Sequence, residues 1–79
     1  MKLPRDLSGD KFARLLCRDW KYQQVHQVGS HIILQTEEPS PQRLAVPAHK
    51  ALRIGTLNGI LRAVAAHKNV SREDILSSL

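Results

Sequence analysis

The sequence contains very little cysteine and no long apolar segment. Cys17 is the only cysteine among 79 residues, so an intrachain disulfide and a cysteine-rich zinc site are both excluded. No apolar stretch approaches the ~18 residues of a membrane-spanning helix, and the first residues contain no apolar signal segment. We therefore expect a cytoplasmic protein that neither enters a membrane nor is secreted.

Glycine and histidine are too few, and wrongly spaced, for several common sites. The four glycines match neither a phosphate-binding P-loop nor a dinucleotide-binding fingerprint. The four histidines have no zinc-ligand spacing, and neither HExxH nor His-x-His occurs. Ser30 and His31 are adjacent, so on a strand they point to opposite faces and do not form part of a triad. We expect no metal and no cofactor.

Acidic residues are outnumbered by basic ones. The chain has 12 Lys and Arg against 7 Asp and Glu, a formal net charge of +5. Hydrophobic residues make up 42% and charged residues 24%, which is typical of a folded globular chain. We expect one domain over residues 1–79 with a thin core. Its charge favours an anionic partner, nucleic acid first and an acidic protein surface second, although solubility alone also explains it.

Apolar residues at helical spacing predict a helix near the start of the chain. Ser8 is suited to cap this helix, and Asp10 lies in its first turn, where a negative charge is favourable. The apolar stripe that follows consists of Phe12, Leu15, Leu16 and Trp20. This helix should bury one side against the rest of the domain.

Three strands are expected after this helix. Residues 22–28 and 31–36 flank Gly29-Ser30, which suits a two-residue hairpin loop whose first position has a positive φ. A polar, proline-bearing loop leads to a third strand, residues 43–46, which Pro47 ends. The predicted sheet is a three-stranded antiparallel meander.

Two more helices complete the prediction. One begins between Arg53 and Thr56 and ends near Asn69, and a short one follows with Ser71 as its cap. Gly59 lies inside the longer helix and suggests close approach to another element. The fold class is α+β, with helices on one face of the sheet and a short extra C-terminal helix.

Alternation along residues 31–36 leaves the other sheet face for function. Ile32 and Leu34 should face the core. The opposite face should carry His31, Ile33, Gln35, Arg43 and Ala45, with Lys50 and Arg53 nearby. His31 opens its strand beside the hairpin turn, where an imidazole can act as an acid or a base near neutral pH. From residue types alone, His31 is either catalytic or an ordinary surface residue.

RNA cleavage fits these residue types better than the other reactions considered. The 2′-hydroxyl of RNA is a built-in nucleophile, so a ribonuclease needs only an acid or base and cations around the phosphate. One histidine can supply roughly 10²–10⁴-fold through general acid–base catalysis. Lysine and arginine neighbours can stabilise the charge that develops.

Three ordered segments resemble the HicA family of toxins. They follow a Leu-Ser-Gly-Asp helix start and read Gly29-Ser30-His31-Ile32, Val46-Pro47-Ala48-His49 and Gly55-Thr56-Leu57-Asn58-Gly59-Ile60-Leu61-Arg62. The resemblance covers nearly the whole chain. It implies a double-stranded-RNA-binding-like α-β-β-β-α domain that cleaves mRNA as the toxin of a type II toxin–antitoxin system. It also implies that the histidine of Gly-Ser-His, His31 in this chain, is catalytic, and that a HicB-type antitoxin covers the active face.

The site that we expect contains one catalytic residue and several RNA-binding ones. His31 would act, without a metal, as the general base or acid at the 2′-hydroxyl or the leaving oxygen. Lys50 and Arg53 would position phosphates, and Arg43 would lie on the same face. His49 is equally consistent with a proton-transfer or phosphate-binding group and with a plain connector residue.

Two other classes of function stay open. One is a non-catalytic RNA-binding module that reads A-form shape through backbone contacts. The other is a protein-interaction domain whose basic face docks only an acidic partner.

Three positions depart from the family pattern. Lys21 stands where glycine often precedes the aromatic residue that opens the first strand. Val28 stands where a basic residue often precedes Gly-Ser-His, and Ile33 replaces what is often an arginine or another polar residue. These changes make the expected RNA face less basic.

Overall fold

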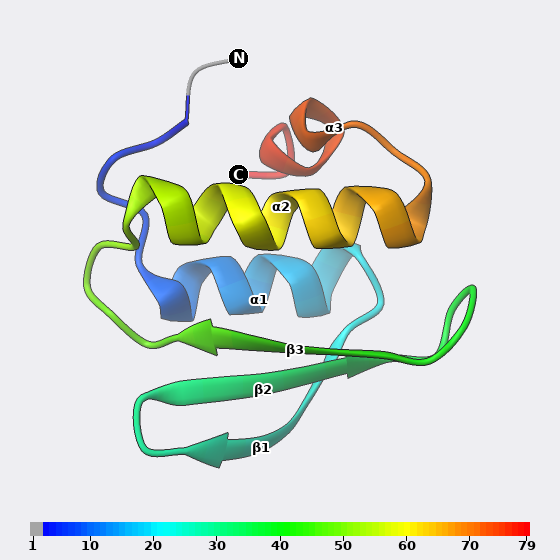
Figure 1. The fold of residues 1–79 in the computed structure, drawn as a ribbon, viewed down its shortest axis with the longest axis horizontal. Helices are drawn as coiled ribbons and strands as arrows, with labels where there is room; N and C mark the ends of the chain where they lie inside the picture. Colours follow the sequence, from blue (N-terminus) through cyan, green and yellow to red (C-terminus); the bar gives the residue numbers. More distant parts are fainter. Residues whose placement is uncertain (1–2) are drawn as a thin grey trace.

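The chain folds into a three-stranded antiparallel sheet with all its helices on one side (Figure 1). The computed structural model describes residues 3–79. Its elements are α1 Gly9–Asp19, β1 Gln23–Val28, β2 His31–Thr36, β3 Gln42–Pro47, α2 Ile54–Lys68 and α3 Arg72–Leu76. This confirms the predicted α+β fold and the α-β-β-β-α order with a short final helix. Of the helices in residues 3–79, none combines the length and apolar character of a membrane span.

The sheet is a meander in which β2 lies between β1 and β3. Gly29 has a φ of 57° in the two-residue turn between β1 and β2, as predicted. Next to that turn, His31 pairs with Val28 on one side and with Pro47 on the other. The register of β1 shifts at a bulge between Gln24 and His26, which the sequence did not indicate.

One face of the sheet forms the core with the helices. Ile32 is 2% exposed and Leu34 is fully buried, as their alternation with His31 predicted. α1 packs against all three strands, and α2 packs against β3. The buried apolar residues from the helices and strands form one cluster, which includes Phe12, Leu15, Leu16, Tyr22, Val46, Leu57, Leu61, Val64 and Ile75. Within residues 3–79, no helix lies on the opposite face of the sheet (Figure 1).

The helix ends follow local sequence signals. The Ser8 side chain accepts a hydrogen bond at the start of α1, and Asn69 ends α2 in the left-handed conformation with a φ of 58°. Ser71 caps α3 and forms a reciprocal capping box with Asp74. Lys21, just before β1, also has a positive φ, of 62°. Glycine adopts this conformation at least cost.

The prediction that Gly59 marks a close contact is wrong, and Gly9 has that role instead. A Cβ atom on Gly59 would meet nothing within 4 Å, because the residue lies on the exposed side of α2. A Cβ atom on Gly9 would lie 1.7 Å from the carbonyl oxygen of Pro47. The start of α1 therefore touches the end of β3 so closely that only glycine fits.

Candidate functional site

The open face of the sheet, called the outer face below, carries nine side chains in three rows across the strands. Directly paired residues of neighbouring strands share a face, so the register assigns each row. From the hairpin turn outward, the rows are Val28, His31 and Pro47, then His26, Ile33 and Ala45, then Gln23, Gln35 and Arg43. None of the nine is acidic. The outer face therefore combines two imidazoles, one guanidinium and a small apolar area.

His31 lies exposed in the first row, at the mouth of the hairpin. The turn next to it is held by the Ala48 amide, which donates to the Ser30 carbonyl oxygen at 2.6 Å. This bond ties the hairpin to the loop that follows β3. Among the described residues, no side-chain hydrogen bond or ion pair engages the imidazole of His31. Its two ring nitrogens are available to a ligand.

The loop of residues 48–53 places cations at the same end of the molecule. The Gly9 amide donates to the His49 carbonyl oxygen at 2.9 Å, and the Leu52 amide donates to the Leu7 carbonyl oxygen at 2.8 Å. His49, Lys50 and Arg53 are exposed. We call this region, with the Gly29-Ser30 turn and the N-termini of α1 and α2, the hairpin end.

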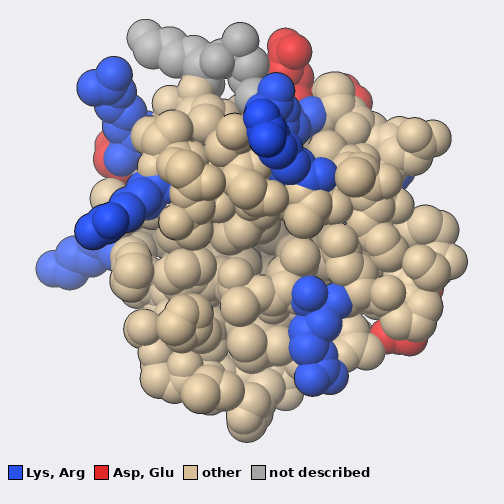
Figure 2. All heavy atoms as spheres, in the orientation of Figure 1, with Lys and Arg blue, Asp and Glu red and all other residues tan. Residues whose placement is uncertain are grey.

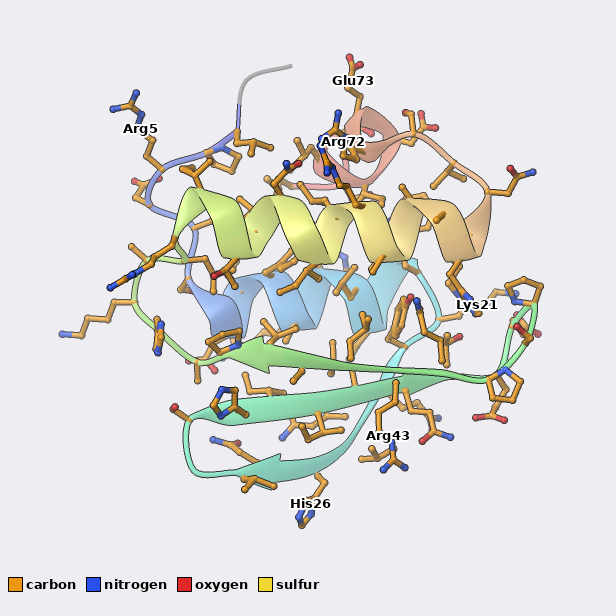
Figure 3. The ribbon with its side chains drawn as sticks, viewed as in Figure 1. Arg5, Lys21, His26, Arg43, Arg72 and Glu73 are labelled. Carbon is orange, nitrogen blue, oxygen red and sulfur yellow. The ribbon has the colours of Figure 1, made fainter. Side chains whose placement is uncertain are left out.

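Lysine and arginine side chains project from the hairpin end, on the left of Figure 2. Lys50 and Arg53 are joined there by Arg5, which precedes α1 and is labelled in Figure 3. Asp6 and Asp10, the latter in the first turn of α1, add exposed carboxylates. Arg53 is also the N-cap of α2, whose first turn contains no acidic residue, so the helix dipole adds to the positive potential.

Arg43 shares the outer face but lies at the opposite end of β3. It is four residues from Pro47, so at roughly 3.3 Å per residue it lies about 13 Å along the strand from the row of His31. Its guanidinium donates to the Gln35 side-chain oxygen at 2.7 and 3.1 Å. The structure thus brings His31, His49, Lys50 and Arg53 to one end and leaves Arg43 apart from them.

The other nucleophilic and titratable side chains are less suited to act as a nucleophile, an acid or base, or a metal ligand. Burial raises the pKa of the Cys17 thiol, which disfavours the reactive thiolate. His67 is occupied, because its Nε2 donates to the Ser40 carbonyl oxygen at 2.7 Å. Within residues 3–79, no three His, Cys, Asp or Glu side chains are grouped so that they could hold a metal ion. The exposed histidines of the outer face remain the best candidates for proton transfer.

Sequence reasoning missed His26 as a site residue. It is exposed and, in Figure 3, its side chain points away from the helices. Alternation through Gln23, Gln24 and Gln27 is too weak to assign this strand to faces. Only the bulge in β1, which leaves no mark in the apolar pattern, shows that His26 shares a face with His31.

When the chain is compared with protein-family models, curated proteins and solved structures, none of them matches it. The resemblance to the HicA family thus rests on the three sequence segments alone.

Proposed function

We propose that this chain is a HicA-type toxin that cleaves mRNA as a metal-independent endoribonuclease, with His31 as its acid or base. The observation that carries the proposal is the position of His31. It lies exposed on the uncovered sheet face, at the end where Lys50 and Arg53 are also exposed. A proton-transfer group at the same end as exposed cations suits cleavage of a phosphodiester by its own 2′-hydroxyl.

The reaction needs one proton removed and one supplied. The 2′-oxygen of the nucleotide bonds to phosphorus while the bond from phosphorus to the 5′-oxygen breaks. His31 either accepts the proton of the 2′-hydroxyl or donates one to the departing 5′-oxygen. Lys50 and Arg53 hold neighbouring phosphates, and the bond between Ala48 and Ser30 keeps their loop in a fixed relation to His31.

The outer face also suits a strand of RNA whose bases are unpaired. Val28 is 56% exposed in the row of His31, and Ile33 is half-buried in the next row. Such apolar side chains can contact base faces, while the cations at the hairpin end contact the backbone. In the toxin–antitoxin proposal, a HicB-type antitoxin covers this face and so blocks access to His31.

The second candidate function is an RNA-binding module that does not cleave. The cluster of exposed cations at the hairpin end favours it, because phosphate contacts alone give salt-dependent binding. Such a module would bind RNA without forming any product.

Cleavage of a transcript by the wild type and His31→Ala tests the proposal. The assay contains a chelator, and growth on expression is measured beside it. We expect the wild type to cleave and to arrest growth, and His31→Ala to lose about 10²-fold or more of the activity. His67→Ala, which removes a histidine bonded to Ser40 at the other end of the sheet, is the matched control and should still cleave.

Circular dichroism of each variant reports whether the fold is retained. Full activity in His31→Ala would show that the proposed mechanism is wrong. Salt-dependent binding of RNA by the wild type without any product would favour the non-catalytic module.

A further inference from the structure

We infer that His26 is a second proton-transfer residue that works with His31 on the same scissile phosphate. The inference rests on the proposed ribonuclease function and deepens it. His26 and His31 come from neighbouring strands, and both are exposed on the outer face. Their spacing in the sequence does not indicate that they are neighbours, because this relation depends on the register of the hairpin.

The bulge in β1 is what turns His26 to the outer face. Gln24 pairs with Leu34, so an unbroken ladder would place Val25 opposite Ile33 and His26 opposite Ile32. Ile32 is 2% exposed and faces the helices, so His26 would then face inward as well. The extra residue shifts His26 to pair with Ile33 instead. A bulge that redirects one side chain in this way is a common device beside functional sites.

The two histidines are diagonal neighbours in the sheet. His31 pairs with Val28, and His26 is two residues from Val28 on the same face. Diagonal neighbours lie roughly 7–8 Å apart, with somewhat less between their Cβ atoms, and long side chains can bridge that gap. A phosphate between the two rings can therefore contact both.

Few other charges bear on this pair. Arg43 and Glu37 both bond to Gln35, which lies in the row farthest from His31. Lys50 and Arg53 are exposed in the loop at the hairpin end. In the part of the chain that the structure describes, His26 has no side-chain hydrogen bond or ion pair, so its ring is as available as that of His31.

A pair of imidazoles completes the proton balance of the reaction. One neutral imidazole takes the proton of the 2′-hydroxyl as the 2′-oxygen bonds to phosphorus. One protonated imidazole gives its proton to the 5′-oxygen as the bond from phosphorus to that oxygen breaks. The products are a 2′,3′-cyclic phosphate and a 5′-hydroxyl, and the two histidines exchange protonation states, which solvent then resets.

The pH dependence of cleavage tests whether two groups act. An oligoribonucleotide that contains a cleavage site mapped with the wild type is the substrate for the wild type, His26→Gln and His31→Gln. We expect a bell-shaped rate profile for the wild type, because one group must be protonated and the other neutral. His26→Gln should lose about 10²-fold or more of the rate and one limb of the profile.

A substrate with sulfur in place of the bridging 5′-oxygen identifies the acid. A thiolate leaves without being protonated, so this substrate should restore cleavage by the variant that lacks the acid and not by the variant that lacks the base. Rescue of either His26→Gln or His31→Gln, but not of both, supports the pair and assigns the two roles.

The controls separate this inference from the proposed function. Gln24→Ala changes an exposed residue of the same strand that pairs with inward-facing Leu34, and it should leave the rate and its profile unchanged. His26→Asn is made as a second variant, and circular dichroism checks the fold of each. If His31→Gln is inactive while both His26 variants keep the wild-type profile, the inference about His26 is wrong and the ribonuclease proposal stands. If the wild type does not cleave, the ribonuclease proposal itself is wrong.

Discussion

At the hairpin end of the sheet, backbone groups hold the chain together, whereas at the opposite end side chains do so. Three amide-to-carbonyl bonds join the turn, the loop of residues 48–53 and the segment that leads into α1, at 2.6, 2.9 and 2.8 Å. Among the residues described, the side chains of His31, His49, Lys50 and Arg53 take part in no hydrogen bond or ion pair. These four side chains of the hairpin end are therefore left free to contact a ligand.

The opposite end, called the far end, uses its polar side chains internally. The Lys68 ammonium donates to Thr36 Oγ1 at 2.9 Å and to the Glu38 carbonyl oxygen at 2.6 Å, and it lies 4.8 Å from the centre of the Tyr22 ring. The Lys21 ammonium lies 2.9 Å from the Glu38 carboxylate.

Under the proposed function, the two ends of the sheet have different tasks. Polar side chains at the far end have partners within the fold, whereas His31, His49, Lys50 and Arg53 would be free to contact RNA. Net charge alone would not locate the site, because lysines and histidines occur at both ends. The distinction lies in which of them have partners within the fold.

The largest expected effect comes from breaking the backbone contacts of the hairpin end. Gly9→Ala would place a Cβ atom 1.7 Å from the Pro47 carbonyl oxygen and would push α1 away from its bond to His49. We expect the free energy of unfolding to fall by about 3 kcal/mol. Urea denaturation measures this loss.

Gly59→Ala is the matched control for that substitution. Its new methyl group meets nothing within 4 Å on the exposed side of α2, so alanine should raise the free energy of unfolding by about 0.5–1 kcal/mol. Equal stability of Gly9→Ala and the wild type would contradict the close contact between α1 and β3.

An intermediate effect is expected from removing one lysine at each end. Lys68→Ala loses two hydrogen bonds and the contact with Tyr22, so the free energy of unfolding should fall by about 1–2 kcal/mol. Lys50→Ala should change stability by no more than about 0.5 kcal/mol. It should instead weaken RNA binding and reduce the slope of log affinity against log salt concentration by about 1.

Thermal melts and RNA titrations at several salt concentrations measure the two outcomes. The comparison between the ends fails if Lys50→Ala destabilises the fold as much as Lys68→Ala does.

The smallest effect is expected from the exposed ion pair of the far end. The hydrogen bond from Lys21 lowers the pKa of the Glu38 carboxyl. A carboxyl with a lowered pKa in the folded state adds stability above the range in which an ordinary glutamate titrates, and that contribution is lost as the pH falls below that range. Glu38→Gln should remove this part of the acid sensitivity and little else, because both side chains are exposed. Melting temperatures measured from neutral into acid pH test it, and an unchanged acid dependence in Glu38→Gln would refute it.

Local signals made most of the fold predictable from the sequence. Ser8 and Ser71 cap helices because a short hydroxyl side chain can accept from the first turn, and that chemistry is visible in the sequence. The two-residue spacing of Ile32 and Leu34 predicted the inner face of β2, because successive side chains of a strand point to opposite faces. The positive φ of Lys21 shows why glycine would suit this position.

The candidate site was only partly predictable, because its arrangement depends on contacts between distant segments. Alternation assigned Arg43 to the correct face, but the antiparallel direction of β3 carries it to the far end. The bulge that redirects His26 depends on the pairing of β1 with β2, and polar residues on both sides of β1 conceal it. Nothing in the sequence near Gly9 indicates that Pro47 touches it.

The loop of residues 48–53 has a further consequence for how this protein can change. Ala48 and Leu52 are anchored through main-chain amides, which every residue except proline supplies, and His49 is anchored through its carbonyl oxygen, which every residue supplies. The solvent-facing residues at positions 49, 50 and 51 can therefore be substituted, in evolution or by design, while the fold is retained. Gly9 cannot be substituted in the same way, because a side chain there would collide with Pro47. Libraries that vary the three loop positions could therefore change ligand preference without loss of the fold.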